Sequence, residues 1–200
     1  SVFEAVGAHA AGSIDDEELR AVEGAACPGA GSCGGQFTAN TMAMALSFLG
    51  VAPMGLGDVP ATHPGKVDAA FAVGQLTGEK AMGVSLRSLI TEDSLRNAAT
   101  AVVASGGSTN AVLHIAAIAA EAGGPFESEM FDELSRNVPV ITDLKPSGQY
   151  LAEDLFDAGG CRLFGQRLRD AGMLVDIPTV SGKTLFEELD AAVETPGQDV

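Results

Sequence analysis

Basic residues are scarce in this chain. The 11 Lys and Arg stand against 27 Asp and Glu, which gives a formal net charge of −16. Binding to a nucleic-acid backbone requires clustered Lys and Arg, so we expect no nucleic-acid partner. The excess of acidic residues is interpreted as a solvated surface, and an acidic patch for a basic partner is the alternative.

Long apolar runs are missing as well. No run reaches the roughly 18 residues that a membrane helix needs, so no membrane association is expected. The longest apolar stretch, residues 111–122, predicts a buried helix in which His114 is a core histidine. Glu4 and His9 interrupt the first apolar residues, which excludes a secretory pattern there. The chain does not begin with Met, which fits an excised segment, and we expect a cytoplasmic protein.

Cysteine is limited to Cys27, Cys33 and Cys161. An odd number without CxxC or zinc-finger spacing fits neither a redox pair nor a zinc site. The simplest reading is a reducing compartment with Cys27 and Cys161 as packed thiols. If Cys33 binds a metal, its other ligands lie outside this chain.

Glycine, by contrast, is concentrated around one of these thiols. The segment PGAGSCGGQFTANTM, residues 28–42, places Cys33 in a glycine-rich turn just before an expected helix at 37–49. Glycines let the main chain come close to a bound group, and a helix N-terminus favours a thiolate, which is both a nucleophile and a metal ligand. From this chemistry alone, a ligand role and a buried structural thiol are equal alternatives.

The remaining chain alternates helical patterns with glycine stops. Capping residues and apolar spacing predict helices at 2–11, 13–22 (capped by Ser13), 37–49, 66–82, 92–104, 111–122, 151–158, 163–171 and 184–193, with a helical turn at 131–135 and a short piece at 86–90. Residues 138–141 and 177–180 predict short strands. The fold class is therefore α/β and helix-rich, with a sheet that is incomplete in this segment. We expect a single partial domain over residues 1–194 and a polar, frayed or truncated tail at 195–200.

Several patterns appear in series. They are CPGAGSCGG at 27–35, FTANTM at 37–42, GGSTNAVLH at 106–114, DLKPSGQY at 143–150, AGG at 158–160 and TVSGKTL at 179–185. In this order they resemble the dihydroxy-acid dehydratases, which belong to the iron–sulfur dehydratase family with the phosphogluconate and sugar-acid dehydratases. The resemblance covers the chain from its first quarter to its last.

The resemblance implies a fold and a cofactor. Family members are longer, with an α/β domain followed by a β-barrel-like domain and the active site between them, so this chain is similar to an internal segment of the first domain. Three cysteines hold a 2Fe–2S cluster, or a 4Fe–4S cluster in the alternative, and Cys33 matches the third. The other two cysteines, the Mg²⁺-binding acids and a modified lysine would precede Ser1. The serine base would follow Val200, so no catalytic residue is assignable here.

The implied reaction is dehydration of a 2,3-dihydroxy acid to a 2-keto acid in branched-chain amino acid biosynthesis. The GAGSCGG form of the loop is similar to the dihydroxy-acid branch, whereas sugar-acid relatives more often carry Pro-Gly-Thr-Cys-Asn. Gln36 stands where many members have Met. The implied partners are a small dihydroxy acid, the remainder of the polypeptide and one or three further copies, as a homodimer or homotetramer.

Residues near these motifs have two interpretations each. Gly34, Gly35, Thr38, Asn40 and Thr41 are expected either to support a cluster at Cys33 or only to form the turn and the first helical turn. The later loop contains Ser108, Thr109 and Asn110. These residues are expected either to lie near the substrate pocket or only to cap the helix that follows.

Three alternative functions remain open at this point. The closest is a sugar-acid or phosphogluconate dehydratase with the same mechanism. The others are a thiol-based redox protein that uses Cys33 alone and a non-catalytic domain. We expect the segment to be unstable alone, because helices that are apolar all round need neighbours that it lacks.

Overall fold

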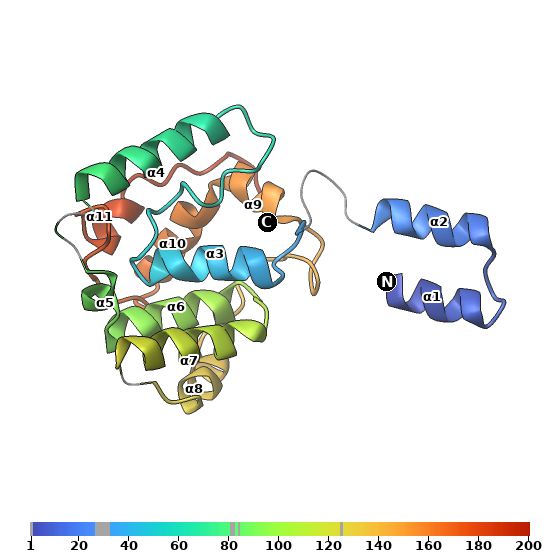
Figure 1. Ribbon diagram of the computed structural model, residues 1–200, viewed down its shortest axis with the longest axis horizontal. Helices are drawn as coiled ribbons and strands as arrows, with labels where there is room; N and C mark the ends of the chain where they lie inside the picture. Colours follow the sequence, from blue (N-terminus) through green and yellow to red (C-terminus); the bar gives the residue numbers. More distant parts are fainter. Residues whose placement is uncertain (1, 27–32, 81–82, 84, 125) are drawn as a thin grey trace.

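Helices make up nearly all of the regular structure in the described residues (Figure 1). The structure is a computed structural model that describes residues 2–26, 33–80, 83, 85–124 and 126–200. Cys27 and the loop to residue 32 therefore lie outside the described residues. The helices are α1 Val2–Ala10, α2 Asp16–Ala25, α3 Thr38–Phe48, α4 Lys66–Lys80, α5 Leu86–Leu89, α6 Glu92–Ala104, α7 Asn110–Ala122, α8 Glu129–Asn137, α9 Ala152–Ala158, α10 Gly160–Asp170 and α11 Leu185–Leu189.

The helix-rich part of the expected fold is confirmed, but the described ranges contain no strand. Only two isolated bridges occur there, Leu144 with Tyr150 and Pro178 with Thr184. The strand predicted at 138–141 is wrong, because Pro139 has no N–H and the Ile141 N–H donates to the Ala104 carbonyl at the end of α6 instead, at 2.8 Å. The α/β class is thus not borne out by this part of the chain.

Several helix ends differ from the predicted ones for local reasons. The residue that caps α2 is Asp15 and not Ser13. Asp15 Oδ1 accepts hydrogen bonds from the N–H groups of Glu17 and Glu18, each at 2.9 Å. In turn, the Glu18 carboxylate accepts a hydrogen bond from the Asp15 N–H, which completes a capping box. Helix α10 begins at Gly160 instead of residue 163, because the positive φ angles of Gly159 and Gly160 let the chain turn directly out of α9.

Helix α6 forms the centre of the core and packs against α3, α7 and α8. Its buried residues are mostly small, including Ala98, Ala99 and Ala101, so neighbouring helices can approach closely. On the other side of α3, Phe48 meets the ring of Phe164 in α10 edge to face, with ring centroids 5.7 Å apart. The core therefore connects α3 to α6 on one side and to α10 on the other, and holds α3 in place.

Helix α7 is buried on one side only. Ala111, Ile115 and Ala119 face the core, whereas Leu113 is 70% exposed and His114 is exposed. The prediction that His114 is a core histidine is wrong. No helix in the described ranges has the length and apolar character that a membrane span needs.

Candidate functional site

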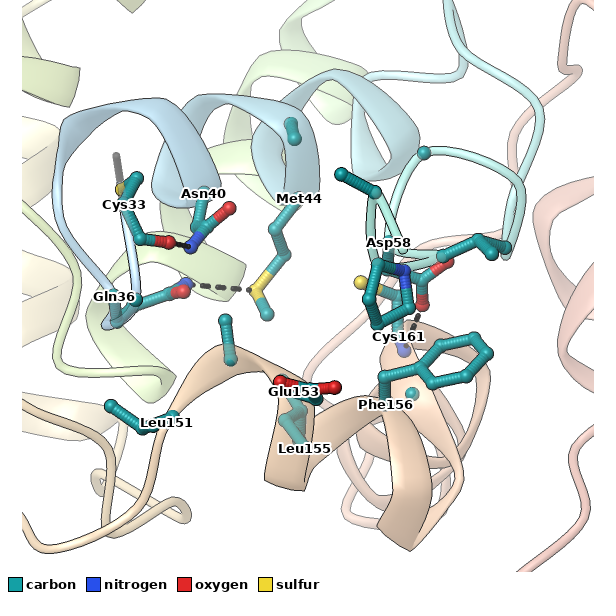
Figure 2. Close-up of a pocket in the computed structure, with 18 of the residues that line it drawn as sticks. Cys33, Gln36, Asn40, Met44, Asp58, Leu151, Glu153, Leu155, Phe156 and Cys161 are labelled. Carbon is teal, nitrogen blue, oxygen red and sulfur yellow. Dashed lines mark hydrogen bonds between the residues drawn. The ribbon is translucent and has the colours of Figure 1, made fainter. Parts of the chain in front are cut away.

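A cavity of about 280 Å³ extends along α3, with Cys33 among the residues at one end and Asp58 and Cys161 at the other (Figure 2). Its walls come from the Cys33 turn, α3, the loop between α3 and α4, and the starts of α9 and α10. Two parts of the chain that are far apart in the sequence, residues 33–66 and 151–161, thus share one cavity. Of the sequence-predicted residues, Cys33, Gly34 and Asn40 line it.

Cys33 is a half-buried, free thiol that precedes an uncapped helix. Its Sγ lies 3.7 Å from the Gly35 carbonyl oxygen. Phe37 occupies the N-cap of α3 and offers no side-chain hydrogen bond to the first turn. The positive end of the α3 dipole is therefore not neutralised by a capping side chain, and it favours negative charge nearby.

Asn40 fixes the main chain around Cys33. Its Nδ2 donates to the carbonyl oxygen of Cys33 at 2.8 Å (Figure 2). The same Nδ2 donates to the carbonyl oxygen of Gly35, also at 2.8 Å. One amide group thus bridges two positions of the turn with its two N–H donors. This side chain of α3 therefore holds the turn in one shape.

We expect Asn40→Ala to lower the free energy of unfolding by about 1–2 kcal/mol, because two partly buried carbonyls lose their donor. Amide hydrogen exchange at residues 33–36 should become faster. Asn137→Ala is the matched control, since Asn137 makes one exposed bond, to the Glu133 carbonyl at 2.9 Å. Equal effects of the two substitutions on stability would contradict the inference that Asn40 holds the Cys33 turn in one shape.

Gln36 and Gly35 anchor the turn to distant segments. The buried Gln36 donates from its backbone N–H to the Lys145 carbonyl at 2.7 Å and from Nε2 to Ser105 Oγ at 3.0 Å. A Cβ on Gly35 would lie 2.6 Å from the Lys145 oxygen, so only glycine fits there. From sequence, Gln36 stood out only as a departure from a related pattern, and nothing local indicated these partners.

The two predicted polar segments, one in the first turn of α3 and one just before α7, meet beside the Cys33 turn. Thr38 Oγ1 lies 3.1 Å from Ser108 Oγ and accepts from Asn110 Nδ2 at 2.9 Å, while Thr41 Oγ1 accepts the Ser108 N–H at 3.0 Å. The structure thus brings four of the predicted residues together. Thr109 is exposed and makes no side-chain cap. Ser108, Thr109 and Asn110 lie outside the walls of the cavity.

Asp58 closes the far end of the cavity and was missed by sequence reasoning. Its Oδ2 accepts the Cys161 N–H at 2.8 Å and so caps α10, whose own N-cap, Gly159, has no side chain. Its Oδ1 is buried without a hydrogen-bond partner among the described residues. No local pattern signals a cap that is supplied from 103 residues away.

Cys33 and Cys161 differ in their chemistry, although both border the cavity. Burial raises the pKa of the Cys161 thiol well above its usual range, and the charge of Asp58 raises that pKa further. Cys161 is therefore a protonated packing group at neutral pH. Cys33 is the more accessible thiol of the two.

The described part of the chain contains no group of three His, Cys, Asp or Glu side chains that could hold a metal ion. Cys33 is therefore a single soft donor at the edge of a cavity. A metal group bound there would need further ligands from elsewhere.

Known proteins resemble this chain along its whole length. The sequence model of the family described as dihydroxy-acid/6-phosphogluconate dehydratase N-terminal matches residues 1–188. Dihydroxy-acid dehydratases from Roseiflexus sp. (strain RS-1), Koribacter versatilis (strain Ellin345) and Thermus thermophilus are 48%, 50% and 49% identical to it. Each alignment covers 100% of this chain but only 35–36% of the relative, so the chain spans about a third of their length.

Proposed function

The chain belongs to the dihydroxy-acid/6-phosphogluconate dehydratase family, and we propose that it is one part of a hydro-lyase that converts 2,3-dihydroxy acids into 2-keto acids. Relatives about half identical to it carry the name dihydroxy-acid dehydratase. Their name and the GAGSCGG loop favour a role in branched-chain amino acid biosynthesis over a sugar-acid or phosphogluconate dehydratase. The proposal includes a cytoplasmic homodimer or homotetramer.

The observation that carries the proposal is the setting of Cys33. A half-buried thiol lies at the end of a cavity, before an uncapped helix, on a main chain held by Asn40. Thiolates are the usual ligands of iron–sulfur clusters, so the donor type fits. We propose Cys33 as one of three cysteine ligands of a 2Fe–2S cluster, with 4Fe–4S as the alternative, and Mg²⁺ held by residues outside this chain.

The chain's own residues would support this role in separate ways. The uncapped N-terminus of α3 places the positive end of the helix dipole beside Cys33, and Asn40 holds the main chain of the turn in one shape. Gly34 and Gly35 add no side chains beside the thiol. When bound, a cluster with an open iron position would supply Lewis acidity toward a departing hydroxyl group.

The second polar loop has a supporting role in this proposal. Ser108 and Asn110 bond to Thr38 at the edge of the Cys33 turn. Because they lie outside the cavity walls, they would support the Cys33 turn from that side, with Thr41 fixing the loop through the Ser108 N–H.

Iron and sulfide analysis of the longer protein, purified without oxygen, tests the proposal. We expect bound iron and sulfide, and formation of a 2-keto acid from 2,3-dihydroxyisovalerate that is much faster than from an aldonate. Preference for the aldonate would favour the sugar-acid alternative. Full activity in a protein without iron would contradict the cluster and favour the thiol-based alternative.

A further inference from the structure

Helix α4 lies at the outer edge of the bundle formed by α3 to α11 (Figure 1). It exposes large apolar side chains along one face, which we call the apolar seam. Val67 is 76% exposed and Phe71 is 73% exposed. Gly74 and Gly78 continue the same face, and nothing lies within 4 Å of the position that a Cβ would take on either. The spacing of these four residues, in steps of four, three and four, is the spacing of core positions in a coiled coil.

The two glycines have no explanation within the described chain. Glycine is among the least favourable residues in a helix interior, and no neighbour approaches these two closely. Gly7 and Gly24 are equally open, so open glycines alone carry no argument. Gly74 and Gly78 differ because they extend a seam of exposed large apolar side chains, where small residues allow a second helix to approach.

We propose that α4 packs antiparallel against α4 of a second copy of this chain. Val67 and Gly78 lie equally far from the point between Ala72 and Val73, and so do Phe71 and Gly74. A two-fold axis at that point sets each large side chain of one copy over a glycine of the other. A parallel pair would set Phe71 against Phe71 and glycine against glycine. Large side chains would then crowd the N-terminal half of the contact, and a gap would remain between the glycines in the C-terminal half.

The flanks of the seam fit the antiparallel pair as well. Asp68 and Gln75 lie on one flank, and Ala70 and Thr77 lie on the other. In the antiparallel register, Asp68 of one copy meets Gln75 of the other, so a carboxylate faces an amide donor on both sides of the axis. Gln75 Nε2 donates one N–H to Glu79 at 2.9 Å and has a second to give. Ala70 meets Thr77 on the other flank. Glu79 lies one turn beyond Gln75 on the first flank, so Asp68 of the other copy also approaches a like charge there, which weakens the pairing.

The area of the seam sets the strength of the contact. Two Phe71 and two Val67 side chains offer on the order of 500 Å², about half of the ~1,000 Å² that a stable interface needs. The seam alone therefore gives weak, reversible pairing, and it would form one part of the interface in a longer protein. This inference does not depend on the proposed dehydratase chemistry.

Disulfide trapping tests the register. In the longer protein, the variant with both Val67→Cys and Gly78→Cys is expected to form a covalent dimer under mild oxidation, with a 67–78 link identified by mass spectrometry. These positions are about 16 Å apart in one helix, too far for an internal disulfide. Each single variant should stay at the background of the unmodified chain, whose natural cysteines serve as the control. Equal dimer from a single variant, or none from the double variant, would overturn the proposal.

Sedimentation equilibrium tests the packing without added cysteines. Gly74→Leu is expected to weaken self-association at least tenfold, because the Leu side chain occupies the space into which Phe71 of the other copy packs. Gly24→Leu in α2 is the matched control, with the same open surroundings but no place on the seam, and should leave association unchanged. Gly74→Ala should raise Tm through helix propensity while weakening association. If Gly74→Leu and Gly24→Leu behave alike, α4 is not the contact.

Discussion

Cys33→Ser in the longer protein is expected to lower kcat by at least about 100-fold and to remove most of the bound iron. Loss of a supporting group around a metal ligand already costs about 10–100-fold, and loss of the ligand itself should exceed that. The fold should persist, because Asn40 bonds to the main-chain oxygens of the turn and not to the sulfur. Iron and sulfide content, kcat and Tm are the measurements.

Cys161→Ser is the matched control for this experiment. Its thiol borders the same cavity but is buried and protonated, so iron content should not change, although stability should fall somewhat. A Cys33→Ser protein that keeps its iron and its activity would show that Cys33 is a structural thiol. Iron loss in both variants would point to unfolding instead of ligation.

Phe48→Ala is expected to have the largest effect on stability. Phe48 is 0% exposed and packs edge to face on Phe164. Truncation of such a ring costs about 3–5 kcal/mol, against about 5–15 kcal/mol for the total stability of a typical domain. The urea midpoint of the chain should therefore drop steeply, and α3 should lose its attachment to α10.

Phe71→Ala is the control, because it makes the same change at a ring that is 73% exposed. At low protein concentration, where α4 does not pair, its effect should stay within about 0.5 kcal/mol. Similar shifts for the two variants would contradict the placement of Phe48 in the core.

Helix ends were predictable where a capping residue or a glycine close in sequence determines them. Thr91 accepts the Ser94 N–H and starts α6 at Glu92, as expected, and Gly50 with φ 79° follows the end of α3. The start of α2 was misplaced because Ser13 and Asp15 both suit an N-cap, and only the chain geometry chooses the carboxylate.

Burial was harder to predict than helicity. The composition of α7 predicted a buried helix, yet Leu113 and His114 are exposed. An apolar helix shows that a neighbour is needed, but it does not show whether the neighbour belongs to the same segment. The strand at 138–141 failed for a related reason, since its backbone partner is a helix end at Ala104.

The candidate site likewise has a part that the local sequence predicts and a part that depends on distant residues. Cys33, Gly35 and Asn40 lie within eight residues, and their local pattern indicated a constrained turn. The supports of that turn, at Ser105 and Lys145, lie 69 and more than 100 residues away from Gln36. Asp58 at the far end depends equally on a distant helix. Pairings of this kind leave no periodic trace in the sequence.

The anchoring of the Cys33 turn by Lys145 and Ala152 also determines when the turn can form during synthesis. The Gln36 N–H pairs with the Lys145 carbonyl, and the Ala152 N–H pairs with the Gly34 carbonyl. A ribosome that adds about 5–20 residues per second needs on the order of 10 s to go from Cys33 to these residues. For that interval the nascent thiol has no shaped surroundings. The turn around Cys33 is therefore expected to take its final shape only after most of this segment has been synthesised.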